Sequence, residues 1–167
     1  MALKRTSEPF IISQPIAESA ANTFTQVQIA VNLNPLDQEV LLVLACDIDC
    51  FAPDMVPGLN TVVTSSISTT SRNSVGTISE SNVVASQRID VKTDGVQYLA
   101  FDKLAAVEPT SDKIDYIAIL ATNNFFLQTS GTNNLGAKGA NTRLWVVRAK
   151  ADSSTYAALV NSELLSA

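Results

Sequence analysis

The feature that most constrains this chain is a period of two in its apolar residues, because that period places side chains alternately on the two faces of a β-strand. Between residues 24 and 33, Val27 and Ile29 fall on one face, whereas Gln26 and Gln28 fall on the other. Such alternation is typical of a strand with one buried and one exposed face. The sequence therefore indicates a protein built of half-buried strands.

Turn signals separate several segments of this kind. The predicted strands are residues 24–33, 39–49, 61–70, 83–93, 96–101, 114–121, 125–129 and 142–151. Residues 39–46 are apolar on both faces, which predicts a central strand. Residues 61–70 are rich in Ser and Thr, which favours a surface or edge position. Asp94-Gly95 is the strongest hairpin signal in the chain.

These segments amount to about eight short strands, and the sequence between them offers no helix long enough for a parallel crossover. We therefore predict an all-β antiparallel β-sandwich, in the form of an eight-stranded jelly roll. Residues 1–22 are interpreted as an N-terminal arm, residues 23–151 as the sandwich, and residues 152–167 as a C-terminal helix packed on the same domain. One further helical turn is predicted over residues 102–107, before Glu108-Pro109.

The C-terminal helix is predicted from its cap and its periodicity. Asp152 or Ser153 can cap the first turn. Four apolar residues then line one side of the helix, as expected for packing on a sheet: Tyr156, Leu159, Val160 and Leu164.

The chain carries a formal net charge of -5, which argues against a general nucleic-acid binder because such proteins need a basic face. Lys4 and Arg5 form a small basic pair near the N-terminus. These two charges can touch a phosphate, but a solubilising terminus is the favoured interpretation.

The N-terminal residues do not have the apolar core of a signal peptide, and the longest apolar run, residues 40–46, is too short to span a bilayer. We therefore expect a chain made in a cytoplasm, without an export signal or a transmembrane segment. Cys46 and Cys50 would lie about 13 Å apart along one strand, too far for a disulfide, and are interpreted as reduced thiols.

Histidine is absent from the sequence, which removes the commonest general base and the commonest metal ligand. We therefore predict that the chain is not an enzyme and carries no cofactor. The best candidates for metal ligation are Asp47, Asp49 and Asp54, whose oxygens could hold calcium. Solvated surface carboxylates remain the favoured interpretation of these three residues.

Two further motifs are interpreted structurally. Residues 131–139 superficially resemble a phosphate-binding loop, but Ala137 precedes Lys138 and a strand follows, so we predict a hairpin loop. The aromatic residues of the apolar strands could stack on a sugar or a base, but they are assigned to the core first. These residues are Trp145, Phe125, Phe126 and Tyr116.

The layout of arm, sandwich strands and polar loops resembles that of single jelly-roll viral capsid proteins. The segments that carry this resemblance are residues 24–33, 39–49 and 142–151. The resemblance implies a virion location. Two departures are the short basic segment, limited to Lys4 and Arg5, and the additional C-terminal helix. If the resemblance holds, another protein, an internal membrane or a different segment must supply the charge that faces the genome.

The N-terminal arm contains an apolar patch formed by Phe10, Ile11, Ile12, Pro15 and Ile16. Docking this patch on an adjacent subunit would bury apolar surface that has little to cover it nearby in the sequence. We therefore hypothesise that the arm ties subunits together, with copies of the chain, and other virion proteins, as partners.

Three alternatives stay open from the sequence. The first is a carbohydrate- or receptor-binding β-sandwich, which requires exposed aromatic rings. The second is a small enzyme that uses paired carboxylates, which requires an acidic cleft. The third is a tail-tube or filament subunit, which differs from a shell subunit in the symmetry of its contacts.

Overall fold

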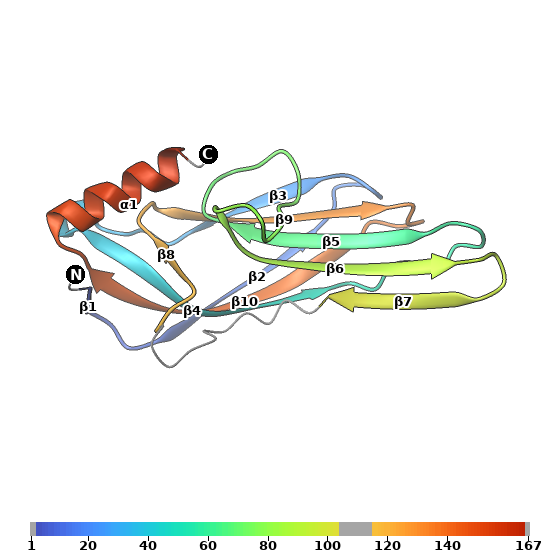
Figure 1. Cartoon of the computed structure of the whole chain (residues 1–167), viewed down its shortest axis with the longest axis horizontal. Coiled ribbons are helices and arrows are strands. Elements are labelled where there is room, and N and C mark those ends of the chain that lie inside the picture. Colours follow the sequence, from blue (N-terminus) through green and yellow to red (C-terminus); the bar gives the residue numbers. More distant parts are fainter. Residues whose placement is uncertain (1–2, 104–114, 166–167) are drawn as a thin grey trace.

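The computed structural model describes residues 3–103 and 115–165, which form a two-layer β-sandwich with one short α-helix (Figure 1). The strands are β1 (Lys4–Arg5), β2 (Phe10–Ala17), β3 (Thr25–Ala30), β4 (Glu39–Cys50), β5 (Thr61–Ser68), β6 (Val83–Thr93), β7 (Tyr98–Lys103), β8 (Ala118–Leu120), β9 (Asn124–Thr132) and β10 (Gly139–Lys150). The 3₁₀ helix η1 (Pro35–Asp37) precedes β4, and helix α1 (Ser153–Leu165) follows β10.

The strands form two antiparallel sheets. The β10 sheet has the order β1-β10-β4-β8, with β2 also paired to β10, and the β5 sheet has the order β3-β9-β5-β6-β7. If β1 and β7 are set aside and the remaining strands are numbered from one in chain order, the two sheets read 1-8-3-6 and 2-7-4-5. This interleaved Greek-key connectivity is that of a jelly roll. The predicted all-β antiparallel sandwich is thus confirmed.

The first strand of the jelly roll lies within the segment that was interpreted as an arm. Residues 10–17 form β2, which pairs with β10 over its whole length. Ile16 is buried in the core, and Phe10 and Ile12 pack against it. Pro15 had favoured an arm, but a proline is tolerated in an edge strand, and among the described strands β2 pairs only with β10. The sandwich therefore begins earlier than residue 23.

The hydrophobic core lies between the two sheets. Its largest fully buried apolar side chains are Phe125, Leu41, Ile48, Ile67, Leu120, Leu127 and Leu144. Each stabilises the fold by ~1.5–3 kcal/mol relative to an exposed position. Cys46 and Cys50 are also buried, and both are free thiols, as the sequence predicted.

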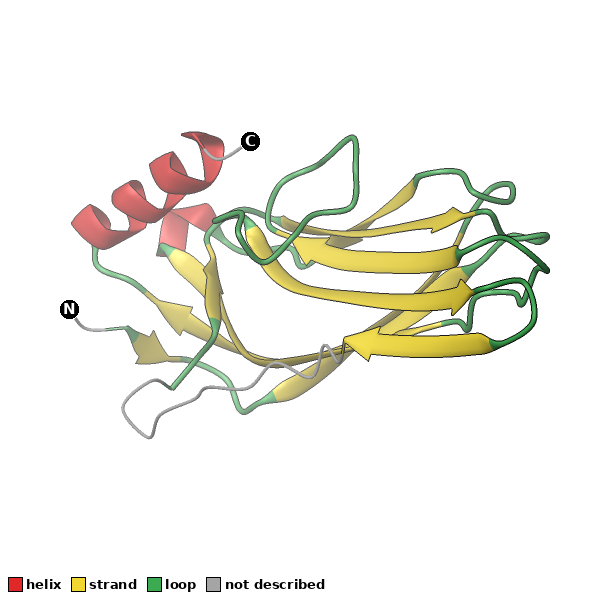
Figure 2. Cartoon of the chain, turned by 45° about the vertical axis from the view of Figure 1, so that its right-hand side comes forward, coloured by secondary structure: helices red, strands yellow, loops and turns green. Residues whose placement is uncertain are grey.

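Strand β5 lies between β9 and β6 in the sheet, so the prediction that residues 61–70 form a surface or edge strand was wrong. Ser66 and Ser68 are fully buried on this strand. The loop of residues 69–82 rises over the β5 sheet (Figure 2), and the Gly76 N–H donates to the Ser66 hydroxyl at 2.8 Å. Gln128 accepts from Ser66 at 2.8 Å and donates to Ser68 at 2.7 Å. Hydrogen-bonded hydroxyls can be buried at little cost, which is why a polar strand occupies the sheet centre.

Strands β6 and β7 form the hairpin that Asp94-Gly95 predicted. Strand β6 has the predicted bounds, but β7 begins at Tyr98, later than the predicted residue 96. The reason is a four-residue loop in which the Asp94 carboxylate accepts from the Val96 N–H at 2.9 Å and from the Gln97 N–H at 2.8 Å.

Helix α1 confirms the predicted C-terminal helix. The Asp152 carboxylate accepts from the Thr155 N–H at 2.8 Å, and this bond lowers the pKa of Asp152 to about 2. Asp102 and Lys103, which belong to the helical turn predicted over 102–107, instead end β7, and residues 104–107 lie outside the described residues. Among the described residues, no helix is long and apolar enough to cross a membrane.

Helix α1 covers one end of the outer face of the β10 sheet. Tyr156, Leu159 and Val160 pack against a second apolar cluster, which contains Val40, Leu42, Val147 and Ala149 from β4 and β10. Leu164, predicted on the same side of the helix, is instead 64% exposed. The apolar face of the helix is therefore narrower than the sequence indicated.

Candidate functional site

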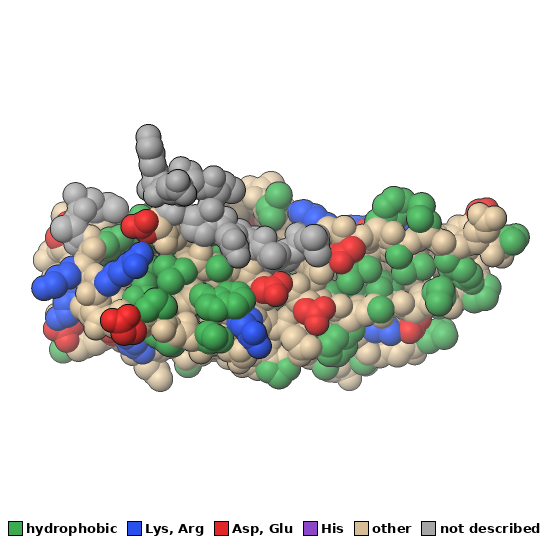
Figure 3. Space-filling view, turned by 90° about the horizontal axis from the view of Figure 1, so that it is seen from below, with side chains coloured by type: hydrophobic (Ala, Val, Ile, Leu, Met, Phe, Trp, Pro, Cys, Tyr) green, Lys and Arg blue, Asp and Glu red, His purple; other side chains and the backbone are tan. Residues whose placement is uncertain are grey.

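Beyond α1, no other described helix or strand packs on the outer face of the β10 sheet, and this open face is the candidate functional site. It comprises Ile11, Ser13 and Pro15 of β2, Asn141, Arg143 and Trp145 of β10, and Asp47 and Asp49 of β4. Register places Arg143 between Ser13 and Asp47, and Asn141 between Pro15 and Asp49. In the view from below (Figure 3), patches of hydrophobic side chains lie between acidic and basic ones.

Trp145 lies half-buried on the open face, so its assignment to the core was wrong. Its neighbours Leu144 and Val146 point into the sandwich, where both are fully buried. The next outward residue, Val147, packs in the cluster under α1. Residues 144–147 of β10 are therefore apolar on both faces, and Trp145 is the outward apolar residue among them that the helix does not cover.

Trp145 carries a cation over its ring. The Arg143 guanidinium lies 5.9 Å from the centroid of the Trp145 ring, within the range of a cation–π interaction. Ile11 lies opposite Trp145 on β2 and is 54% exposed. An aromatic ring, an arginine and an aliphatic side chain thus form one contiguous strip.

A shallow hollow of about 500 Å³ lies beside this strip. Its lining consists of Ser13, Gln14, Pro15, Asp47, Asp49, Asn141, Thr142 and Arg143. Two carboxylates on β4 and one guanidinium on β10 therefore line the same hollow. The open face offers both signs of charge.

The structure does not bring the three predicted metal-ligand candidates together. Asp47 and Asp49 lie exposed on the open face. Asp54 instead pairs with the Lys138 ammonium at 2.6 Å, and this bond lowers the pKa of Asp54. Within the described parts of the chain, no three His, Cys, Asp or Glu side chains form a group that could hold a metal ion.

The predicted inter-subunit residues divide between the two faces of β2. Phe10, Ile12 and Ile16 pack against or within the core of their own sandwich. Ile11 and Pro15 point outward on the open face. Alternation along a strand explains this division, since residues of odd number on β2 share one face.

The predicted basic pair lies in β1. Lys4 and Arg5 are both exposed, and they pair with Lys150 and Ala149 at the end of β10. The Arg5 guanidinium lies 4.0 Å from the Asp115 carboxylate. The pair therefore lies near the end of the sheet that α1 covers.

The glycine-rich loop of residues 131–139 connects β9 in the β5 sheet to β10 in the β10 sheet. The prediction of a hairpin loop was therefore wrong, because β9 and β10 do not pair with each other. Buried Glu18 holds it through the Gly131 N–H at 2.5 Å and the Lys138 N–H at 2.8 Å. The Lys138 ammonium is engaged by Asp54. The loop thus directs its lysine to an internal ion pair, unlike a phosphate-binding loop.

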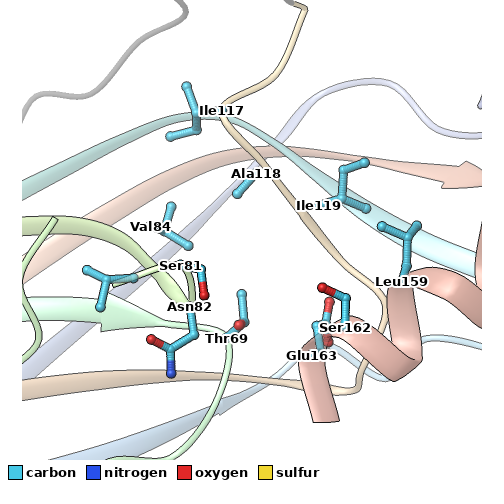
Figure 4. Close-up of a pocket in the computed structure, with 11 residues that line it drawn as sticks. Thr69, Ser81, Asn82, Val84, Ile117, Ala118, Ile119, Leu159, Ser162 and Glu163 are labelled. Carbon is cyan, nitrogen blue, oxygen red and sulfur yellow. The ribbon is translucent and has the colours of Figure 1, made fainter. Parts of the chain in front are cut away.

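A second hollow, of about 230 Å³, lies between α1, β8 and the loop before β6. Ile117, Ile119 and Leu159 line its upper part, and Glu163 and Ser162 lie at its lower right (Figure 4). Glu163 is 8% exposed and was not predicted as a site residue. A signal was present, because residue 163 lies seven positions after Tyr156 and so falls on the same helix stripe.

No family model and no curated protein matches this chain. Among solved structures, a chain of Desmodium yellow mottle tymovirus is similar at 10% sequence identity. The match covers 89% of this chain and 94% of that chain, with a TM-score of 0.26. So distant a likeness carries no argument about function, which must be drawn from the surfaces of the molecule.

Proposed function

We propose that this chain is a non-enzymatic structural subunit that assembles with copies of itself, as a capsid or other virion protein of a virus or phage does. The observation that carries the proposal is the strip of Ile11, Arg143 and Trp145 on the open face. Tryptophan and arginine are the residues most enriched among those that dominate the affinity of protein interfaces.

The charges of the open face suit a second copy of the same chain. Asp47 and Asp49 on β4 lie beside Arg143 on β10. A copy that turns its own open face toward this one can therefore set acidic groups against basic groups. Within this proposal, Ile11 and Pro15 are the two residues of the predicted inter-subunit patch that contact the neighbouring subunit.

The proposal is tested by light scattering coupled to size-exclusion chromatography of the full chain, with electron microscopy of any large species. Ile11→Asp is expected to abolish the large species, because it places a charge at the centre of the apolar strip. Leu36→Asp is the matched control, since Leu36 is 92% exposed on η1, away from the open face.

Assembly of the wild type and of Leu36→Asp into large species, with loss of these species in Ile11→Asp, would support the proposal. A wild-type chain that stays monomeric over the whole accessible concentration range would contradict it, as would equal assembly of both variants. Filaments instead of closed particles would favour the tail-tube alternative, since open heterologous contacts generate helices.

Carbohydrate binding is the second candidate, and the hollow that Asp47, Asn141 and Arg143 line favours it, because their polar groups can bind sugar hydroxyls. Arg143 lies over the Trp145 ring, so a sugar would have to displace it before stacking. Trp145 is the single tryptophan of the chain, so its fluorescence reports on this face. A saturable change in fluorescence upon titration with a panel of sugars would support this second function.

A further inference from the structure

Strand β7 is an edge strand that exposes apolar residues on both faces. It ends the β5 sheet, and no other described strand pairs with its outer edge. All six of its residues are exposed. Leu99 is 59% exposed and Phe101 is 53% exposed.

The sequence of β7 does not suit an exposed edge. Tyr98, Leu99, Ala100 and Phe101 form a continuous apolar run, which is typical of strands covered on both faces. Edge strands in soluble proteins are normally protected by charges, prolines or bulges. In β7 the charged residues Asp102 and Lys103 occur only at the end of the strand.

The backbone of β7 also directs N–H and C=O groups toward the edge of the strand that faces away from β6. The Asp94 N–H donates to the Gln97 carbonyl at 3.4 Å, at the closed end of the hairpin. Because hydrogen-bonded and non-hydrogen-bonded pairs alternate along an antiparallel ladder, Leu99 and Phe101 direct their backbone groups toward β6. Tyr98, Ala100 and Asp102 therefore direct their N–H and C=O groups toward the open edge.

We propose that β7 pairs antiparallel with β7 of a second copy, around a twofold axis at Ala100. The two five-stranded β5 sheets then join into one continuous sheet. This inference rests on the proposed function, that the chain assembles with itself, and it names one contact of that assembly.

The side chains of β7 are complementary to themselves in this register. Val91, opposite Ala100, is buried, so Ala100, Tyr98 and Asp102 share the face that points toward the sandwich interior. Placing Ala100 opposite its own copy sets Leu99 against Phe101 on the outer face. Aliphatic and aromatic cross-strand pairs of this kind are favourable.

The polar groups fit the same register. It sets Tyr98 opposite Asp102, where the phenol can donate to the carboxylate, and it sets Gln97 opposite Lys103. Neither charge of β7 meets a like charge across the axis. This register therefore gives hydrogen-bond partners to the outer backbone groups of β7, pairs its apolar side chains and avoids contacts between like charges.

A cysteine at residue 100 tests the contact in the full-length chain. Residues paired by hydrogen bonds across an antiparallel ladder have Cα atoms about 5.5 Å apart, within reach of a disulfide. Ala100→Cys is therefore expected to give a disulfide-linked dimer under mild oxidation, which a reductant separates. Burial raises the pKa of each native thiol, Cys46 and Cys50, to about 12, so these thiols do not compete.

Ala30→Cys is the matched control, because Ala30 is exposed on β3, the opposite edge strand of the same sheet. We expect Ala100→Cys to cross-link at least about tenfold faster than Ala30→Cys, since the paired strands hold the two thiols at high effective concentration. Adding Leu99→Lys to Ala100→Cys should return the rate to that of the control.

The outcomes separate this inference from the proposed function. Equal cross-linking rates at residues 100 and 30, in a chain that still assembles, would overturn the β7 contact and leave self-assembly standing. A rapid Ala100→Cys dimer that persists in the Ile11→Asp background would support the β7 contact even if the open face plays no part. A strictly monomeric wild type without a rapid Ala100→Cys dimer would overturn both.

Discussion

The Glu163 carboxylate of α1 accepts a hydrogen bond from the Ala121 N–H at 2.6 Å and one from the Thr122 N–H at 3.0 Å. These two backbone groups belong to the connection between β8 and β9. The side chain of a C-terminal helix thereby satisfies amides that would otherwise lack partners where the two sheets meet. Glu163 ties α1 to the sandwich.

Removing this carboxylate should destabilise the protein. Glu163→Ala is expected to lower the free energy of unfolding by ~1–3 kcal/mol, because it leaves the two amides without acceptors. Glu163→Gln should cost less, since its carbonyl oxygen can still accept a hydrogen bond. Urea unfolding followed by circular dichroism measures the free energy of unfolding of both variants. An unchanged free energy in Glu163→Ala would refute the claim that Glu163 holds α1 on the sandwich.

The same residue should make stability depend on pH. Burial raises the pKa of the Glu163 carboxyl above its ordinary value of 4.5, so the folded protein holds this proton more tightly than the unfolded chain does. The contribution of this raised pKa to the free energy of unfolding is therefore complete at pH values below the ordinary pKa of 4.5, and it is lost as the pH rises through the raised pKa.

The comparison with Glu163→Gln isolates this effect. The stability of the wild type relative to Glu163→Gln is expected to fall as the pH is raised from about 4 toward about 8. Denaturant unfolding of both proteins across this range measures the difference. A difference that stays constant, or that grows with pH, would contradict the assigned direction.

Gln128 should be critical for the centre of the β5 sheet. Its amide joins Ser66, Ser68 and Gln26, and it is fully buried. Gln128→Ala is expected to lower the free energy of unfolding by ~2–3 kcal/mol, because it creates a cavity, removes the acceptor of the Ser66 hydroxyl and removes a donor to the Ser68 hydroxyl. Gln28→Ala, at an exposed position on β3, is the control and should change stability by less than about 0.5 kcal/mol.

Gly139 should tolerate no side chain at the start of β10. A Cβ atom there would collide with the Ile16 carbonyl oxygen and lie 3.0 Å from the Ala17 Cα atom. Gly139→Ala is therefore expected to destabilise the pairing of β2 with β10, at a cost of ~1–3 kcal/mol. Gly136→Ala is the control, because a Cβ at Gly136 meets nothing within 4 Å. Equal melting temperatures for the two variants would show that β2 is not held against Gly139.

Part of the open face could be predicted from the sequence. Ile11 and Pro15 were expected to contact a neighbour, and Asp47 and Asp49 were expected to be solvated. Arg143 was not singled out, because an isolated arginine in a strand has no distinguishing pattern. Trp145 was misassigned, because a residue within an apolar run gives no sign of which face a helix will cover.

Local patterning alone determined that this chain forms strands, a hairpin at Asp94-Gly95 and a capped C-terminal helix, because alternation, turn chemistry and capping act within a few residues. The tertiary structure decided which strands are central and where the sandwich begins. Strand β2 is defined by pairing with β10 far along the chain, and the polar strand β5 is buried because Gln128 and the loop of residues 69–82 satisfy its hydroxyls. Contacts between residues distant in sequence leave no local pattern, so only the folded chain revealed them.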